Sequence, residues 1–396
     1  MRSPSTKIRV LVVHSQLAQH GSERYLYEVC KALDKNRFEV SILTRPVFIR
    51  NQFYYHKLTE LGLTIHCKLI TRRHIRFPIK KLYARLGWMR RLVGALQQWQ
   101  VRLWCGRLVR SADVVAIIGI ETYCDAFAPW LDESGNVVIH HMNHKFQFER
   151  DYFNECRQRR VVILDEQQRL EVKASPMADC EMFYFPLSMS LNDRAMLSVT
   201  PPATGRLMRF AVVSRLYKDR PNEPLFRCFA ALARAVPAEL YFYGGGDASQ
   251  YALLLGELKI VDKVRFMGHQ SNLEAALLRD RPAVLWLIAM GPSISYGSVE
   301  VASLGLPMVF WNLSRQSYEQ ILAQTDGALH AFADEASFVD FNLKLLQDPV
   351  RLKEHAEHLC RHVRSRFEIS HYISSLEDYY ETVACASDVV EPNRVP

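Results

Sequence analysis

The sequence predicts an α/β protein built from two doubly wound domains, and three observations lead to that class. Short apolar runs rich in β-branched residues alternate with helix-like segments, which is typical of a parallel sheet with helices on both faces. The 396 residues exceed the size at which one hydrophobic core usually stops growing. A stretch without apolar periodicity, containing Pro201, Pro202 and Gly205, separates two such series.

The elements of the first series begin at the N-terminus. A strand is expected at 8–13 and an amphipathic helix at 23–33, and further strands follow at 38–44, 64–70, 113–119, 136–142 and 161–165. The second series has candidate strands at 208–214, 239–243, 263–267, 283–288 and 307–311. Its candidate helices are 222–235, 249–258, 337–347, 349–367 and 371–383.

These elements divide the chain into four parts. The sequence predicts an N-terminal domain at 1–190, a linker at 191–206, a C-terminal domain at 207–370, and a helix with a polar tail at 371–396. Two such domains that face each other would place a ligand crevice between the carboxyl ends of both sheets, so residues that follow strand ends matter most.

Composition narrows the class of protein further. Hydrophobic residues make up 49% and charged residues 23%, which is typical of a globular chain. The nine cysteines are scattered without a C-x-x-C pair, which argues against a disulfide framework or a zinc ribbon and favours a reducing compartment. No signal peptide and no run of eighteen uncharged apolar residues is visible, so a cytoplasmic location is expected.

Positive charge is concentrated in one segment. Residues 71–110 hold eleven Lys and Arg and no acidic residue, against a net charge of +8 for the whole chain. Apolar residues at roughly helical spacing lie between the charges, and they include Trp88 and Trp99. A basic amphipathic helix with tryptophans indicates that the protein binds an anionic membrane surface, on the inner face of the membrane. The alternatives are a solvated helix face and, less favoured, nucleic acid.

A predicted anion site follows the strand at 283–288. The loop beginning at Gly291 and containing Ser293, Ser295, Gly297 and Ser298 leads into a short helix, whose first backbone N–H groups suit a phosphate. Glu300 lies one turn inside that helix, where it can hydrogen bond a ribose or sugar hydroxyl. An ordinary βα unit with a surface glutamate is the alternative.

Other motifs also follow strand ends. Gly21 permits close backbone approach after the first strand, and Gly244 and Gly245 form a turn after the strand at 239–243. Arg215 and Arg220 follow the first strand of the second half and are suited to clamp a diphosphate by charge-assisted bonds.

Together these motifs resemble the retaining glycosyltransferases of family 4, which have the GT-B fold. The family's G-G-x-E-R opening is similar to His20-Gly21-Ser22-Glu23-Arg24, with His20 in place of the first glycine. Its G-R-L-x-x-x-K motif is similar to Ser214-Arg215-Leu216, with Arg220 at the lysine position. Its strand with a Gly-x-Gly turn and its V-x-F-x-G run match 240–246 and 264–268. The resemblance covers nearly the whole chain and implies two facing Rossmann-like domains, with a C-terminal helix that returns toward the N-terminal domain.

The resemblance also implies roles for residues. Arg215 and Arg220 would bind the donor diphosphate, backbone near Met267 would hold the nucleobase, and Glu300 would contact the ribose. In the E-x7-E signature the first glutamate falls at Pro292, and the hydroxyls of Ser293 or Ser295 or the loop amides are the possible substitutes. The expected donor-binding residues are Gly21, Arg215, Arg220, Gly244, Gly245, Met267, Gly268, Ser293, Ser295, Gly297, Ser298 and Glu300.

A histidine near the acceptor is a further implied feature of the family. His141 is the preferred catalytic candidate, with His140 and His144 as the neighbours that an alignment also allows. A zinc site at His140 and His144 and a structural histidine cluster are the alternatives.

The resulting prediction is a retaining, metal-independent hexosyltransferase without a cofactor. It would move a sugar from a nucleotide-sugar donor to a glycan or lipid-linked acceptor in the synthesis of a cell-surface polysaccharide such as lipopolysaccharide or capsule. The chain has no D-x-D motif, so no metal ion is expected. A catalytically silent relative and a sugar-nucleotide epimerase remain alternatives. A nicotinamide-dependent oxidoreductase is disfavoured because the first βα turn lacks G-x-G-x-x-G.

Overall fold

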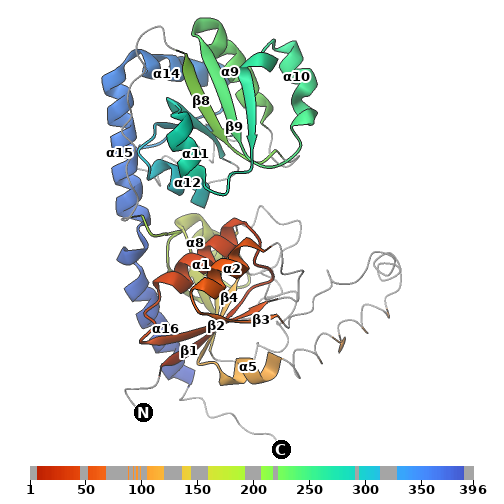
Figure 1. The fold of residues 1–396 in the computed structure, drawn as a ribbon. Coiled ribbons are helices and arrows are strands. Elements are labelled where there is room, and N and C mark those ends of the chain that lie inside the picture. The colour runs from red at the N-terminus through yellow and green to blue at the C-terminus, as the bar shows by residue number, and fades with distance from the viewer. Residues whose placement is uncertain are drawn as a thin grey trace, which may run out of the picture. The chain divides into compact units, whose positions relative to one another are not determined.

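Two compact units, each built on one parallel sheet, make up the protein in a computed structural model (Figure 1). Unit 1 comprises residues Met1–Ser190 and Ile369–Pro396, and unit 2 comprises Leu191–Glu368. The predicted class, α/β with two doubly wound domains, is confirmed. The structure describes residues 7–44, 52–67, 88, 92, 95, 96, 99, 105–119, 136–143, 159–191, 207–216, 222–289, 294–312 and 328–387.

Unit 1 contains a sheet in which seven described strands run in the order β3-β2-β1-β4-β5-β6-β7. All neighbouring pairs are parallel. The chain adds β2 and then β3 on one side of β1, and it then places β4 on the other side of β1, where the direction of winding reverses. Ligands of such sheets bind beside the carboxyl ends of the strands at this reversal. The strands are β1 (Ile8–Val13), β2 (Phe38–Thr44), β3 (Thr64–Cys67), β4 (Val114–Ile118), β5 (Val137–His140), β6 (Arg160–Ile163) and β7 (Glu181–Tyr184).

Helices of unit 1 form where apolar residues repeat every three or four positions. In α1, Tyr25, Leu26 and Val29 are buried on one face, while α8 begins at an N-cap where the Asp165 side chain accepts a hydrogen bond from the backbone N–H of Gln168. The helices are α1 (Gly21–Ala32), α2 (Phe53–Glu60), α5 (Gly106–Ser111), α8 (Glu166–Lys173) and α16 (Ile373–Ser387), with a 3₁₀ turn η8 (Ile369–His371) before α16.

The C-terminal helix α16 belongs to unit 1 and is held there by buried and charged contacts. The Tyr380 hydroxyl lies 2.8 Å from Nε2 of His140 on β5. Arg37 binds the carboxylates of Glu377 and Glu381, at 2.7 and 2.8 Å. Glu377 is mostly buried and also accepts a hydrogen bond from the Asp34 backbone N–H, so this contact is stronger than an exposed ion pair.

Unit 2 contains six described strands in the order β10-β9-β8-β11-β12-β13, again all parallel. The reversal of winding lies between β8 and β11. The strands are β8 (Met208–Val213), β9 (Ala238–Tyr243), β10 (Val264–Gly268), β11 (Val284–Ala289), β12 (Met308–Asn312) and β13 (His330–Phe332). The helices are α9 (Glu223–Ala235), α10 (Ala252–Glu257), α11 (Leu273–Asp280), α12 (Tyr296–Ala302), α14 (Glu335–Gln347) and α15 (Pro349–Phe367), with 3₁₀ turns η6 (Ala248–Tyr251) and η7 (Val261–Lys263).

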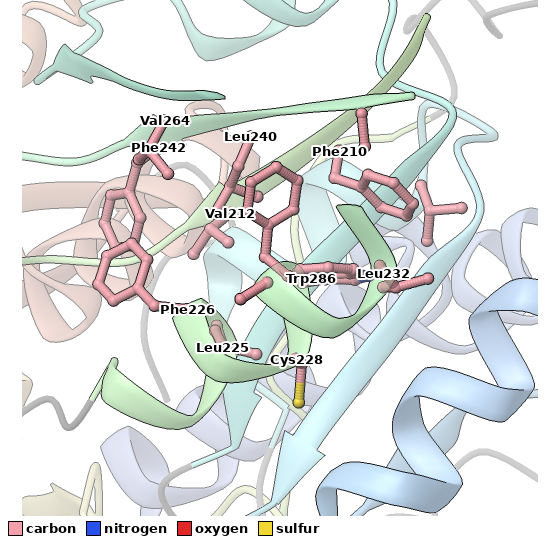
Figure 2. Packing of buried hydrophobic residues seen from close by; sticks show 14 of the residues in the cluster. Phe210, Val212, Leu225, Phe226, Cys228, Leu232, Leu240, Phe242, Val264 and Trp286 are labelled. Carbon is pink, nitrogen blue, oxygen red and sulfur yellow. The ribbon is translucent and has the colours of Figure 1, made fainter. Parts of the chain in front are cut away.

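The core of unit 2 is aromatic. Figure 2 shows α9 packed on the strands, with Phe226 beside Phe242 and Trp286 beneath Phe210. The indole N–H of Trp286 donates to Oδ1 of the buried Asn342 at 2.9 Å, so the one polar atom of this side chain is satisfied in the core. This packing fixes the ends of β8, β9 and β11 relative to one another.

Several predicted features lie outside the described residues. They are most of the basic segment 71–110, all but the first residue of the linker at 191–206, and the polar tail from 388 onward. Within the described residues, no helix combines the length and apolar composition that a bilayer crossing requires.

Candidate functional site

Three loops at the carboxyl edge of the unit 2 sheet are joined by backbone hydrogen bonds. The Ser214 N–H donates to Tyr243, and the Leu216 N–H donates to Gly245 at 2.9 Å. The Gly244 N–H in turn donates to Gly268 at 3.0 Å. The structure therefore brings together the predicted residues Arg215, Gly244, Gly245, Met267 and Gly268, whose loops follow the adjacent strands β8, β9 and β10.

Gly244 is required by packing, because its backbone lies against the loop that carries Arg215. A Cβ atom at Gly244 would lie 1.7 Å from the Ser214 carbonyl oxygen. Gly246 has φ +127°, in the region that favours glycine, and a Cβ there would lie 2.5 Å from the Leu216 carbonyl oxygen. A Cβ atom at Gly245 would have space, because the nearest atom, the Cβ of His269, would lie 3.6 Å away. The glycine turn thus holds the arginine loop in place.

Gly244→Ala is expected to lower the free energy of unfolding of unit 2 by at least about 2 kcal/mol, because backbone must move to admit the methyl group. Gly245→Ala is the matched control and should change that free energy by less than about 0.5 kcal/mol. Urea unfolding of both variants measures the difference. Equal losses would mean that the two loops are not in the contact described.

Polar side chains hold the Arg215 loop by hydrogen bonds to its backbone carbonyl groups. The amide of Asn222, which is buried, donates to the Arg215 carbonyl and to the Tyr251 hydroxyl, both at 3.2 Å. The Gln250 amide donates to the Leu216 carbonyl at 2.8 Å. The sequence prediction missed these residues; an asparagine directly before a helix that begins Glu-Pro was the available signal.

Backbone groups near Met267 are partly engaged within the protein. The Met267 carbonyl accepts from the Gln270 amide at 2.7 Å, and the Gly268 carbonyl accepts from Gly244. Gly268 has φ +69°, and a Cβ there would meet nothing within 4 Å, so its glycine is required by conformation and not by packing. The predicted nucleobase position at Met267 and Gly268 stays a prediction.

The predicted anion loop is described only from residue 294 onward. At its helix, the Ser295 hydroxyl accepts from the Ser298 N–H at 3.2 Å and lies 2.9 Å from the Ser298 hydroxyl. This capping engages part of the donor set that was expected for a phosphate. Glu300 is half-buried on α12, which follows β11 and so lies across the winding reversal from Arg215. Three further residues of the predicted site lie outside the described residues: Arg220, Ser293, and Pro292, which stands where the resembling family has a glutamate.

Unit 1 has a cluster of polar side chains at its own winding reversal, between the carboxyl ends of β1 and β4. Nδ1 of the buried His14 lies 2.9 Å from the Ile118 carbonyl oxygen, which joins the two strand ends. The carboxylate of Glu23, at the start of α1, lies 3.7 Å from Nε2 of His14. A Cβ atom at Gly21 would meet nothing within 4 Å, so packing does not require the predicted glycine.

His140 and His141, the predicted catalytic histidines, are both fully buried. His140 lies between two hydroxyls, with Tyr25 2.8 Å from Nδ1 and Tyr380 2.8 Å from Nε2. Burial lowers the pKa of His140 to about 3, so the ring is neutral and accepts one hydrogen bond while donating the other. This arrangement favours the structural alternative for His140.

His141 lies on the other side of β5, with Nε2 3.8 Å from a carboxylate oxygen of Glu171 on α8. The third candidate, His144, lies outside the described residues. Among the residues that the structure describes, no three His, Cys, Asp or Glu side chains form a group that could hold a metal ion.

Comparison with known proteins identifies the fold. No family model matches the sequence, and no curated protein matches it. Solved structures match nearly the whole chain, and the chain has their GT-B fold of two Rossmann-like domains, as the resemblance predicted. At these identities the likeness establishes the fold alone.

Three of these structures illustrate the match. Sucrose-phosphate synthase from Thermosynechococcus elongatus has a TM-score of 0.68 and 14% identity, with 96% of this chain and 100% of that chain covered. HepE from Anabaena, in complex with UDP and glucose, has a TM-score of 0.68 and 10% identity over 95% and 100%. The lipopolysaccharide outer core galactosyltransferase WaaB, in its apo form, has a TM-score of 0.64 and 14% identity over 96% and 99%.

Proposed function

We propose that the protein is a glycosyltransferase that uses a nucleotide-sugar donor. The observation that carries the proposal is the set of joined loops in unit 2, which holds Arg215 at the winding reversal of a Rossmann-like sheet, beside the helix that bears Glu300. Ligand sites in open α/β sheets lie at this place. HepE, which shares the fold, is known in complex with UDP-glucose, and this supports a nucleoside diphosphate sugar as the donor here.

The chemistry of the proposal depends on the departing diphosphate. As the bond from the anomeric carbon to the bridging oxygen breaks, negative charge grows on that oxygen, and preorganised cations stabilise it. Arg215 supplies one such cation, and Arg220 is proposed as a second. We extend the proposal to transfer of a hexose with retention of configuration, without a metal ion, to a glycan or lipid-linked acceptor of cell-surface polysaccharide synthesis.

A nucleotide-sugar screen tests this function. UDP-glucose, UDP-galactose, GDP-mannose and ADP-glucose are each added to the purified protein, and the melting temperature and the release of nucleoside diphosphate are measured. A ligand that binds only the folded state raises the melting temperature. Stabilisation with sugar transfer or hydrolysis supports the proposal; stabilisation with an isomerised sugar nucleotide supports the epimerase. Stabilisation without any turnover supports the silent relative, which Pro292 favours.

We also propose that the protein works at the inner face of an anionic membrane. Five described residues of the basic segment, Trp88, Leu92, Ala95, Leu96 and Trp99, are helical and exposed. Their spacing in the sequence corresponds to one face of a helix at about 100° per residue. Trp88 is 62% and Trp99 57% exposed, and with Leu92 and Leu96 they make a group of exposed large apolar side chains, which is typical of an interaction surface. Tryptophan and leucine beside excess positive charge suit the lipid interface.

Replacing Trp88 and Trp99 together by alanine is expected to weaken binding to phosphatidylglycerol vesicles about 10-fold or more, because two large apolar side chains leave the interface. Cosedimentation measures this, with Leu253→Ala and Val261→Ala as the matched double variant, since both control residues are exposed in unit 2. Binding to DNA in place of vesicles, or equal vesicle binding by both double variants, would count against the membrane.

A further inference from the structure

A group of basic side chains lies at the amino edge of the unit 2 sheet. His330 is the first residue of the edge strand β13, and its ring centroid lies 5.2 Å from that of His355 on α15 and 4.5 Å from that of Phe341 on α14. Nε2 of His355 lies 3.0 Å from the carbonyl oxygen of Met308, the first residue of β12. The nucleotide-sugar site proposed above lies at the opposite, carboxyl edge of this sheet, so these residues form a separate cluster.

Two further basic side chains lie on the same face of α15 as His355. Arg351, His355 and His358 are four and three positions apart, which is the spacing of one helix face. The Arg351 guanidinium lies over Phe341, with its central carbon 5.9 Å from the ring centroid. Arg351 and His358 are exposed, whereas His330 and His355 are half-buried. The cluster therefore extends from two half-buried imidazoles to the solvent.

No carboxylate forms an ion pair with these basic groups within the described part of the chain. Asp348 is the N-cap of α15 and accepts hydrogen bonds from backbone N–H groups of the first turn. Asp340 on α14 pairs with Lys344 at 2.7 Å. Glu354, next to His355 on α15, is exposed and makes no ion pair with the cluster. The positive charge of the cluster is therefore not balanced by these carboxylates.

The basic groups disfavour one another's charged forms. Burial lowers the pKa of His330, and the charges of Arg351 and His358 lower it further. Burial also lowers the pKa of His355, to about 4, and the same basic neighbours add to this effect. An anion bound beside these rings would act in the opposite direction, because it favours the charged form of each imidazole. Anion binding and proton uptake are therefore coupled at this place.

We propose that Arg351, His330 and His358 bind a small oxyanion, a phosphate or sulfate group, between β13 and α15. Arginine binds such groups through parallel N–H donors, and each imidazole adds an N–H donor. The Met308 carbonyl can only accept, so Nε2 of His355 donates to it and this bond holds α15 against β12. His355 is thus a positioning residue. The inference does not depend on the proposed glycosyltransferase activity.

Isothermal titration of the full chain with sodium sulfate tests the site. Sulfate does not titrate between pH 6 and pH 8, so any pH dependence comes from the protein, and sodium chloride at equal ionic strength is the reference. The expected Kd is about 1 mM at pH 6. Binding should be about 10-fold weaker at pH 8, which corresponds to a rise of about one unit in the pKa of an imidazole when the anion binds. Titrations in two buffers of different ionisation enthalpy should show the proton uptake, and inorganic phosphate should compete with sulfate.

Variants on the two faces of α15 locate the bound anion. Arg351→Ala should weaken sulfate binding about 10-fold or more, since a charge-assisted hydrogen bond is lost, and Arg351→Lys should recover part of it. Lys353→Ala is the matched control, because Lys353 is exposed, lies two positions further along the helix and contacts Glu357 at 3.7 Å. It removes the same charge and should change the affinity by less than about 2-fold. Arg215→Ala should also leave the affinity unchanged.

Three results would overturn the site. Equal sulfate affinity in Arg351→Ala and Lys353→Ala would show that the cluster does not hold the anion. A loss confined to Arg215→Ala would place sulfate at the predicted diphosphate site. A Kd weaker than about 10 mM for wild type, or one that does not change with pH, would mean an adventitious ion only. None of these results bears on the turnover of nucleotide sugars, so the proposed function is tested separately.

Discussion

Replacing Arg215 by alanine is expected to weaken binding of UDP about 10- to 100-fold, the largest single loss of affinity that the structure predicts. A hydrogen bond to a charged group contributes about 1.5–3 kcal/mol, and arginine engages phosphate through two parallel N–H groups. The side chain is exposed, on a loop that Asn222 and the glycine turn hold in place, so its removal should not disturb the fold. Isothermal titration with UDP measures the change.

Arg234→Ala is the control for this experiment. Arg234 is also exposed in unit 2, but it lies in the last turn of α9, which runs back from the carboxyl edge of the sheet. Its removal takes away the same charge without touching the loops, so affinity for UDP should stay within about 2-fold, since an exposed distant charge is largely screened. Equal losses in both variants would indicate that net charge, and not the Arg215 loop, holds the nucleotide.

The fold could be predicted because its central strands are buried on both faces. Strands such as β1, β4 and β11 appear in the sequence as continuous apolar runs, and their predicted ends differ from the structure by a residue or so. The strands that were missed, β7 and β13, lie at sheet edges and have four and three residues. An edge strand is buried on fewer sides, so its apolar run is shorter and easier to miss, although the edge strands β3 and β10 were predicted.

The proximity of some candidate site residues could be predicted, for a related reason. Residues that follow parallel strands gather at one sheet edge, so the sequence alone predicts that Arg215, Gly244 and Gly268 lie close together. Burial by distant partners could not be predicted in the same way. His140 is enclosed by Tyr25 and Tyr380, which are 115 and 240 positions away in the chain. Nothing in the local pattern Val-Ile-His-His distinguishes an enclosed histidine from an exposed one.

Lowering the pH from 7 to 5 is expected to cost unit 1 about 2 kcal/mol of unfolding free energy through His140 alone. The pKa of this ring is about 3 in the folded protein and about 6.5 in the unfolded chain. Between those values the unfolded chain binds a proton that the folded protein excludes, so stability is present above pH 6.5 and falls as the pH falls toward 3. Protonation would place a positive charge between two tyrosine hydroxyls in an apolar core, and burial disfavours that charge.

Urea unfolding at pH 7 and pH 5 measures this term when wild type is compared with His140→Gln. Glutamine does not titrate and can still hydrogen bond one tyrosine hydroxyl, so the variant should be less stable at pH 7 and lose about 2 kcal/mol less than wild type on acidification. His56→Gln should behave as wild type, since His56 is exposed. Other titrating groups, among them His355 with a pKa of about 4, contribute equally to all three proteins and cancel in the comparison. The same acid sensitivity in His140→Gln and wild type would mean that the His140 ring has the same pKa in the folded and the unfolded chain, so that its burial between the two tyrosine hydroxyls does not exclude the proton.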